Sequence, residues 1–422
     1  MKTIKYLIFL ETVFLLIPPV VHAAGTIDEY RFFSKALSRE ITGRVYLPGD
    51  YDSNNPSKRF PVIYLLHGAS DGYEAYDPIY AVVDQLIAFN MIKPVILIMP
   101  DGLAPPYNGS FYTNSALYGN FEDYISHDLI TYIDSAFYTK NERSKRAIMG
   151  ASMGGYGALK IAFKHQELFT GVVGHSGPVN TNMMDIFIPD LITEDGGTVP
   201  FHWSPGPGKS LTNLTYTMAG AFSPNLNNVY KVDFPLDSLA KPIPDVMERW
   251  KNENVCEIAK AYLPGTRLGI RFDCGNADDY YLYYQNRSLA DTLTKYEIPF
   301  NYEEYPGTHT SGIPTRALQS LTYFDKLFLS TDAGAPLLPS GLQWEVYPTP
   351  ASNTLTISNN HNGPYLDKRI IQIADATGRV VLRQMLMGDS DNINTSNLSN
   401  GLYFFKIQCG NIIQTGKTLI VH

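Results

Sequence analysis

Between residues 26 and 330, short apolar segments alternate with segments in which apolar residues recur at helical spacing. We predict strands over 41–47, 60–66, 94–100, 145–150, 170–177, 267–275 and 298–305. We predict helices over 121–137, 157–169, 280–296 and 315–329. Strands that are apolar on both sides are typical of a buried parallel sheet, and their alternation with helices indicates helices on both faces. The expected fold class is therefore α/β, in a domain over residues 24–330.

Residues 178–264 interrupt this alternation, because they contain many prolines and aromatic residues and little clean periodicity. We interpret this block as an insertion at the carboxyl ends of the strands, where it would form a roof over a site. The alternative is a peripheral excursion with a small core of its own.

The chain changes character after residue 330. Residues 331–341 have the composition of a linker, and residues 342–422 contain short predicted strands separated by turn signals such as Thr377-Gly378 and Asn400-Gly401. This pattern predicts a small antiparallel β-sandwich at the C-terminus.

The N-terminal residues 1–23 have the features of a signal peptide. Lys2 and Lys5 precede an apolar run, and small residues flank His22 before an expected cleavage after Ala23. No later segment is long and apolar enough to span a bilayer. The mature protein is therefore expected to be exported, without a transmembrane segment.

Composition removes several function classes. The net charge of -8 argues against a nucleic-acid partner, which would require a basic surface. The three cysteines, Cys256, Cys274 and Cys409, form neither a Cys-x-x-Cys pair nor a zinc-type arrangement with histidines. We expect buried free thiols, no metal and no cofactor.

The segment "GASMGGYG" at residues 150–157 is the strongest chemical signal. It follows a predicted strand and precedes a predicted helix, which is the context of a nucleophile elbow centred on Ser152. Gly150 and Gly154 would allow the strand and the helix to cross closely. The alternative is a glycine-rich helix start with a capping serine.

A serine nucleophile requires a base and a group that orients the base, and in this fold they follow in the order serine, acid, histidine. His309, in "YPGTHTSG" after the strand 298–305, is the histidine that remains once the others are excluded by position.

Three candidates for the acid lie in "FDCGNADDYY", after the strand that begins at residue 267. Asp273 is still on the strand, where a structural hydrogen bond is expected, and Asp279 is expected to cap the following helix. We select Asp278, and Asp279 remains the alternative.

The oxyanion of an acyl-transfer intermediate requires two backbone N–H donors. Met153, which follows the nucleophile, would supply one, and Ala69, in the loop after strand 60–66, would supply the other. His67 precedes the serine in the chain, and we interpret it as a structural residue that holds the oxyanion loop.

These residues resemble a known family. "YLLHG", "MPDG", "RAIMGASMGGYGALKIAFKHQELFTGVVGHSG", "DCGNADD" and "GTHT" occur in the order found in the esterase D-like family of α/β hydrolases, over about residues 35–330 without the insertion. That family includes feruloyl and acetyl-xylan esterases, S-formylglutathione hydrolases and mycobacterial mycolyltransferases. The resemblance implies Ser152 as nucleophile, Asp278 as acid and His309 as base. Many members have Gly-Gly-His where this chain has Gly307-Thr308-His309, a departure on the leaving-group side of the pocket.

The tail resembles the C-terminal sorting domain of the type IX secretion system, on "YPTPASNTLTI", "IADATGRVV" and "NLSNGLYFFKI". This implies recognition by that machinery and export across the outer membrane, with release or attachment at the cell surface. A carbohydrate-binding sandwich is the alternative for the tail.

Together these features predict a secreted serine esterase that hydrolyses acylated carbohydrate, as feruloyl or acetyl esters, or small acyl esters. Two alternatives remain: an acyltransferase like the mycolyltransferases, and a catalytically silent binding protein on the esterase fold.

Overall fold

The computed structural model describes residues 23–262, 267–332, 344–347, 351–359, 369–386, 390–409 and 412–422. The predicted signal peptide, apart from Ala23, and residues 333–341 of the predicted linker lie outside these ranges.

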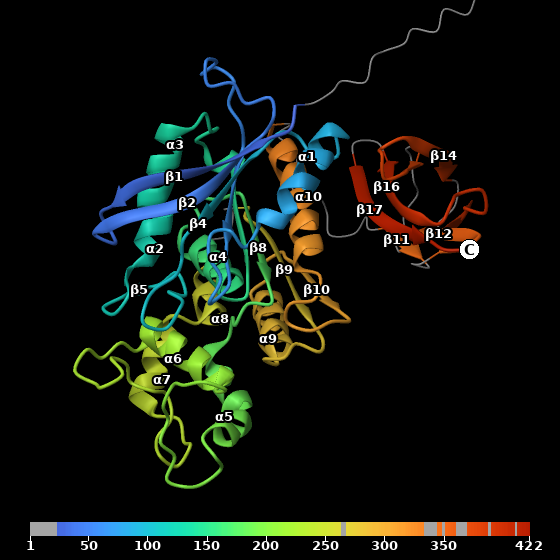
Figure 1. Ribbon diagram of the computed structural model, residues 1–422. Coiled ribbons are helices and arrows are strands. Elements are labelled where there is room, and N and C mark those ends of the chain that lie inside the picture. The colour runs from blue at the N-terminus through green and yellow to red at the C-terminus, as the bar shows by residue number, and fades with distance from the viewer. Residues whose placement is uncertain are drawn as a thin grey trace, which may run out of the picture.

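An eight-stranded sheet forms the centre of the α/β domain, in the order β1-β2-β4-β3-β7-β8-β9-β10. From β4 to β10 all neighbours are parallel, whereas β1 and β2 pair antiparallel at one edge (Figure 1). The strands are β1 (Thr26–Ser34), β2 (Arg39–Leu47), β3 (Val62–Leu66), β4 (Ile96–Pro100), β7 (Arg146–Ala151), β8 (Gly171–His175), β9 (Gly269–Gly275) and β10 (Asn301–Tyr305).

Helices cover both faces of this sheet, which confirms the predicted fold class. One face packs against α1 (Tyr80–Ala88), η1 (Asp77–Ile79) and α10 (Ile313–Asp332). The other packs against α2 (Phe121–Asp123), η2 (Tyr124–Leu129), α3 (Ile130–Ala136), α4 (Met153–Lys164), α8 (Val255–Ile258) and α9 (Leu282–Lys295). Two short elements complete this part, the β5 (Asn114–Ser115) and β6 (Gly119–Asn120) pair and η3 (Arg143–Lys145).

Strand β3 illustrates why the central strands are apolar throughout. Its residues Tyr64 and Leu66 pack in the core on the α4 side, and Ile63 and Leu65 pack in the core on the α10 side. Successive side chains of a strand point to opposite faces, so a strand that is covered twice requires apolar residues at every position. The sequence did not predict β1 or α1.

The insertion contains α5 (Ile188–Glu194), α6 (Ser210–Phe222), α7 (Pro244–Asn252) and α8, together with η4 (Thr181–Phe187) and η5 (Ala259–Ala261). Of these helices, α5, α6 and α7 gather at one end of the α/β domain, whereas α8 lies between α4 and α9 (Figure 1). Phe187, Tyr216 and Trp250 belong to the same buried cluster as the α4 face of the sheet. This shared packing speaks against a separate small core, and the insertion over residues 178–264 stays a prediction.

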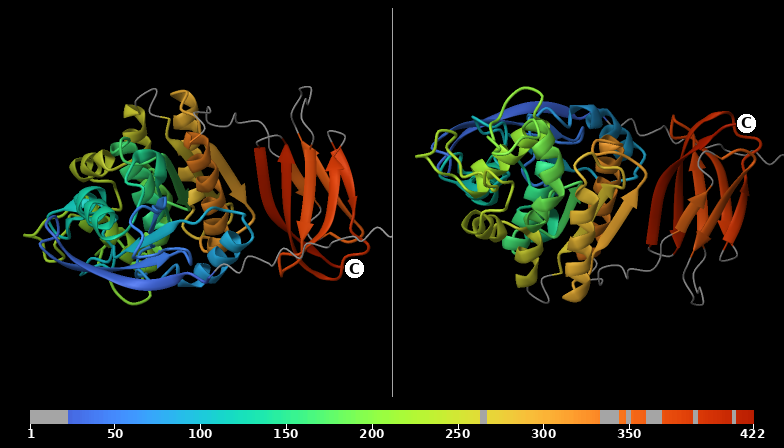
Figure 2. Two further views of the ribbon diagram at one scale, coloured as in Figure 1. Left: turned by 90° about the horizontal axis from the view of Figure 1, so that it is seen from above. Right: turned by 90° about the horizontal axis from the view of Figure 1, so that it is seen from below.

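The C-terminal part consists of two antiparallel sheets (Figure 2). One holds β11 (Trp344–Tyr347), β12 (Thr354–Asn359) and β15 (Ser390–Asn394), and the other holds β13 (Arg369–Ala374), β14 (Val380–Leu386), β16 (Gly401–Cys409) and β17 (Ile412–Ile420). Leu355 and Ile393 of the first sheet share one buried cluster with Ile371 and Ile407 of the second. This packing agrees with the predicted sandwich.

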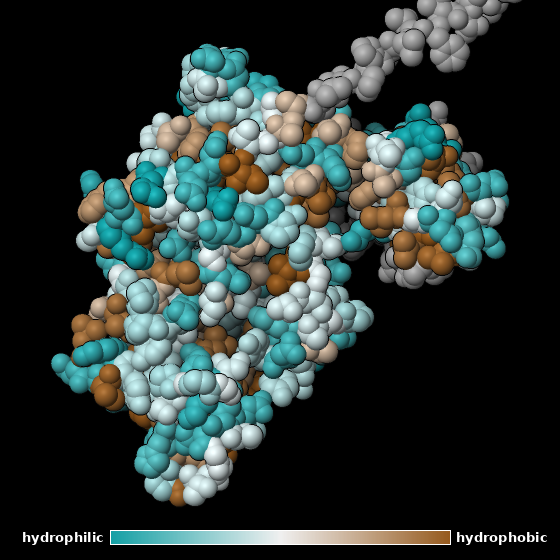
Figure 3. All heavy atoms as spheres, viewed as in Figure 1, coloured by the Kyte–Doolittle hydropathy of each residue, from teal (hydrophilic) through white to brown (hydrophobic). Residues whose placement is uncertain are grey.

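The hydrophobic surface patches are small and the described cysteines are buried, as in other globular proteins. On the face drawn in Figure 3, hydrophobic residues form separate small patches among polar ones. Cys256 and Cys274 are buried and free, as expected, and the side chain of Cys409 lies outside the described residues.

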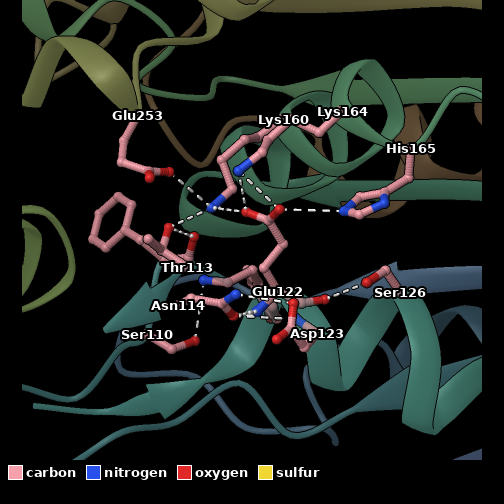
Figure 4. Close-up of polar contacts among 12 residues, drawn as sticks. Ser110, Thr113, Asn114, Glu122, Asp123, Ser126, Lys160, Lys164, His165 and Glu253 are labelled. Carbon is pink, nitrogen blue, oxygen red and sulfur yellow. Dashed lines mark hydrogen bonds and ion pairs between the residues drawn. The ribbon is translucent and has the colours of Figure 1, made fainter. Parts of the chain in front are cut away.

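A buried group of charges fastens α4 to its neighbours (Figure 4). The fully buried Lys160 ammonium lies 3.1 Å from a carboxylate oxygen of Glu122 and 3.2 Å from one of Glu253. Glu122 also accepts from Lys164 at 2.8 Å and pairs with His165 at 3.2 Å. Burial alone would raise the pKa of Glu122, but its hydrogen bond with His165 and the two lysines outweigh burial and hold the pKa well below its ordinary value of 4.5.

We expect Glu122→Gln to lower the free energy of unfolding by about 3 kcal/mol at pH 7, because Lys160 stays buried with one carboxylate fewer. A pKa that is lowered by folding stabilises the fold above the ordinary value, and this contribution is lost as the pH falls. The difference between wild type and variant should therefore be constant from pH 7 to about pH 5 and shrink below about pH 4.5. Urea unfolding across this range measures it.

Glu257→Gln is the matched control, since Glu257 pairs with Lys260 at the surface. It should change stability by less than about 1 kcal/mol. A Glu122→Gln variant that is no less stable than this control would contradict the role assigned to the buried charges.

Candidate active site

Ser152 occupies the turn between β7 and α4 in a strained backbone conformation. Its φ is 56° and its ψ is −121°, a combination that residues with a side chain rarely adopt. Its N–H donates to the carbonyl of His175 on β8 at 2.8 Å, and its own carbonyl accepts from Tyr156 at 3.0 Å. The predicted strand-turn-helix context is present, and α4 begins at Met153 rather than at residue 157.

Glycines permit the close crossing around this turn. A Cβ at Gly154 would lie 1.9 Å from the carbonyl oxygen of Leu66, and a Cβ at Gly150 would lie 2.4 Å from the backbone of Gly154. Any side chain at either position would therefore push α4 away from β3 and β7.

His309 lies between Ser152 and Asp278. Its Nε2 is 2.9 Å from Ser152 Oγ, and its Nδ1 is 2.7 Å from Asp278 Oδ2. An ionised carboxylate only accepts, so Nδ1 carries the proton and Nε2 is left to accept the serine proton. His309 and Asp278 are both buried. The structure thus brings together three side chains that the sequence separates by up to 157 positions.

The two neighbouring aspartates have different contacts. The second oxygen of Asp278 accepts from the N–H groups of Tyr280 at 2.9 Å and Leu282 at 3.3 Å, at the start of α9. Asp279 accepts from the backbone N–H of His309 at 3.2 Å. The expectation that Asp279 caps α9 is wrong, because the turn directs the carboxylate of Asp278 to these amides.

Ala69 and Met153 lie close together beside the serine. A Cβ at Gly109 would contact both Met153 Sδ, at 2.7 Å, and Ala69 Cβ, at 3.5 Å. Within the described part of the chain, the N–H groups of Ala69 and Met153 have no hydrogen-bond acceptor. Both groups are therefore available to an acceptor that enters from outside.

Both ring nitrogens of His67 bond to backbone groups rather than to Ser152. Its Nε2 accepts the backbone N–H of Gly102 at 2.7 Å, so its proton is on Nδ1, which donates to the carbonyl of Gly68 at 2.8 Å. Its ring thereby ties the loop that carries Ala69 to the loop after β4, in agreement with the structural role predicted from its position.

A second serine-histidine-aspartate arrangement lies beneath the site. His175 Nδ1 is 2.8 Å from Asp273 Oδ2, His175 Nε2 is 3.1 Å from Ser320 Oγ, and Arg316 pairs with the other oxygen of Asp273. Burial alone would raise the pKa of Asp273, but His175 and Arg316 outweigh it and lower the pKa. Ser320 is 0 % exposed, so it is closed to any substrate.

Asp273 therefore has the structural role that was expected of it, whereas Arg316 and Ser320 carried no signal in the sequence. Among the residues that the structure describes, no group of three His, Cys, Asp or Glu side chains could hold a metal ion.

Residues 34–313 match the family model described as "Putative esterase". The chain belongs to this esterase family. Residues 345–422 of the esterase match a second model, described as "Secretion system C-terminal sorting domain". No helix within the described ranges is long and apolar enough to cross a membrane.

Curated relatives match about a third of the esterase. An esterase of Mycobacterium tuberculosis is 34% identical over 155 residues, which cover 36% of this chain and 32% of that protein. A protein of Xylanibacter ruminicola named endo-1,4-beta-xylanase/feruloyl esterase is 34% identical over 152 residues, 34% of this chain and 20% of that protein. The chain thus spans about a third or less of the length of these relatives.

The solved structure of an esterase shares the fold of the α/β domain. A ferulic acid esterase superposes with a TM-score of 0.52 at 19% sequence identity, covering 72% of this chain and 99% of that one.

We expect Asp273→Asn to lower the free energy of unfolding by about 3 kcal/mol, because it leaves the buried Arg316 and His175 without a carboxylate. Asp279→Asn is the matched control, since Asp279 is exposed and accepts one backbone N–H, and it should cost less than about 1.5 kcal/mol. Urea unfolding monitored by circular dichroism measures both. Equal stability of the two variants would show that the Asp273 group does not stabilise the fold.

Proposed function

We propose that this chain is a secreted serine esterase that hydrolyses carboxylic esters through an acyl-enzyme on Ser152. The observation that supports this proposal is the placement of His309, with one ring nitrogen 2.9 Å from Ser152 Oγ and the other 2.7 Å from Asp278. Membership of the esterase family supports the same class of reaction.

In the first half of the reaction, Ser152 Oγ attacks the ester carbonyl carbon while His309 Nε2 takes the serine proton. Asp278 holds the ring in the required tautomer and stabilises the imidazolium. The tetrahedral intermediate collapses when His309 returns the proton to the alcohol oxygen, which breaks the ester bond and leaves the acyl group on Ser152.

In the second half, water attacks the acyl carbon while His309 takes a proton from it, and the carboxylic acid leaves as Ser152 recovers its hydrogen. The negative charge on the carbonyl oxygen in both intermediates would be stabilised by the N–H groups of Met153 and Ala69, which have no acceptor among the described residues. Such a donor contributes about 3 kcal/mol to transition-state stabilisation.

We propose acylated carbohydrate, with feruloyl or acetyl groups, as the substrate class. One curated relative is named both a xylanase and a feruloyl esterase, and another is named acetyl esterase. The sorting domain at residues 345–422 supports export by type IX secretion, which would place the enzyme outside the cell with polymeric substrates.

We propose Ala69, Met153 and the three side chains as the catalytic set of a domain over residues 24–330, with 178–264 as an insertion. Residues 1–23 would be removed as a signal peptide, and the linker 331–341 would join the sorting domain 342–422.

Ser152→Ala should lower kcat/KM for p-nitrophenyl acetate by about 10⁴-fold or more while the circular dichroism spectrum is unchanged, because no other group can form the acyl-enzyme. A fluorophosphonate should label the wild type and not this variant. Ser320→Ala is the control, since Ser320 also contacts a histidine but is fully buried, and it should keep activity within about tenfold. Labelling or turnover by Ser152→Ala would end the proposal.

Asp278→Asn should lower kcat by about 10⁴-fold, because an amide cannot hold His309 with its proton on Nδ1. Asp279→Asn should lower kcat by less than about tenfold, since its carboxylate contacts only the backbone of His309. Steady-state kinetics on p-nitrophenyl acetate compares them, and the reverse order would assign the acid to Asp279.

A further inference from the structure

Four tyrosines gather immediately after the acid of the site. Tyr280, Tyr281, Tyr283 and Tyr284 occupy four of five consecutive positions, at the turn into α9 and in its first turn. Tyr281 is 37% exposed and Tyr284 is 43% exposed, and the other two are half-buried. Isolated exposed aromatic residues are ordinary, but a contiguous exposed group beside a reactive centre is a feature of binding sites.

An arginine that is itself ion-paired holds two of these rings in place. The ring centroids of Tyr283 and Tyr284 are 4.2 Å apart, and the Arg287 guanidinium lies 5.2 Å and 5.9 Å from them. Arg287 in turn makes two hydrogen bonds to Glu304 on β10, at 2.6 Å and 2.7 Å. Rings that are already ordered lose little conformational entropy on binding, which favours affinity.

One member of the group, Tyr280, contacts the proposed base directly. The ring of Tyr280 stands edge to face against the ring of His309, with centroids 4.9 Å apart. Asp278, which pairs with His309, also accepts the N–H of Tyr280. Tyr281 has a left-handed φ of 56°, a conformation that a bulky residue adopts at a cost of about 1–3 kcal/mol.

The position next to His309 decides which part of a substrate these rings would meet. His309 gives its proton to the leaving alcohol, so groups that adjoin His309 face the alcohol portion of the ester. The ligand expected there is flat, apolar on one face and polar at its edges, since the rings are flanked by Arg287, Glu304 and the phenol hydroxyls.

We propose that Tyr280, Tyr281, Tyr283 and Tyr284 form a sugar-binding subsite that takes pyranose rings of the alcohol portion. The axial C–H groups of a pyranose carry partial positive charge and pack against the negative face of an aromatic ring, while its hydroxyls stay at the edge and reach water or Arg287. This subsite rests on the proposed esterase function and makes its substrate specific: an acylated polysaccharide whose chain lies along the start of α9.

The test compares two esters in Tyr284→Ala and Tyr281→Asn, asparagine being chosen because it tolerates the left-handed backbone. We expect the ratio of kcat/KM for an acetylated xylo-oligosaccharide to kcat/KM for p-nitrophenyl acetate to fall at least tenfold in each variant, through a higher KM for the oligosaccharide. Tyr296→Ala is the matched control, since Tyr296 is also 43% exposed but lies after the other end of α9, and its ratio should stay within twofold of wild type.

The possible outcomes distinguish failure of the sugar subsite from failure of the proposed esterase function. If wild type hydrolyses both esters, Ser152→Ala hydrolyses neither, and the ratio is unchanged in both tyrosine variants, the subsite is overturned and the esterase function stands. If wild type hydrolyses neither ester, both proposals fail together.

Other occupants of the tyrosine group would give different results. An equal loss for 1-naphthyl acetate would mean that the rings bind any flat apolar alcohol, and a dimer that dissociates in Tyr284→Ala would mean that they bind a second copy of the chain. Either result would overturn the sugar assignment.

Discussion

The strained turn at Ser152 is the constraint on which the rest of the site depends. With φ at 56° and ψ at −121°, the residue costs about 1–3 kcal/mol relative to ordinary backbone, and the surrounding fold must supply that free energy. It does so with the hydrogen bond from Ser152 N–H to the His175 carbonyl and with the close packing of α4 on β3, which only glycine at position 154 permits. The Ser152 hydroxyl is thereby held at the N-terminal end of α4, where it makes no capping hydrogen bond to that helix.

The topology of the sheet explains why the other two side chains reach this hydroxyl. Ser152, Asp278 and His309 each follow the carboxyl end of a parallel strand, β7, β9 and β10 respectively. Parallel strands end at a common edge, so the loops after them converge although their residues are far apart in the chain. Burial of Asp278 and His309 then shields from water the hydrogen bond between them, which aligns the ring.

Contact geometry alone does not distinguish the proposed reactive centre at Ser152 from a structural group in this molecule. Ser320, His175 and Asp273 repeat the same types of contact, but all three are buried and Arg316 neutralises the aspartate. The difference is access: Ser152 retains exposed surface, whereas Ser320 has none. The buried Lys160 with Glu122 and Glu253 is likewise a structural group, which fastens α4 to α2 and to the insertion.

The sequence by itself determined the α/β alternation, the elbow around Ser152 and the candidate His309, because strand burial, close crossing and loop position each require particular residue types at particular places. The sequence left Asp279 open as an alternative to Asp278, since adjacent aspartates differ only in where a turn directs their carboxylates. The sequence also assigned the cap of α9 to Asp279, whereas the carboxylate of Asp278 accepts from the amides at the start of that helix. Arg316 and the tyrosines that follow Asp278 also carried no periodic signal. Arg316 pairs with Asp273 on β9, and Tyr280 packs against His309 in the loop after β10, and only tertiary packing decides such contacts.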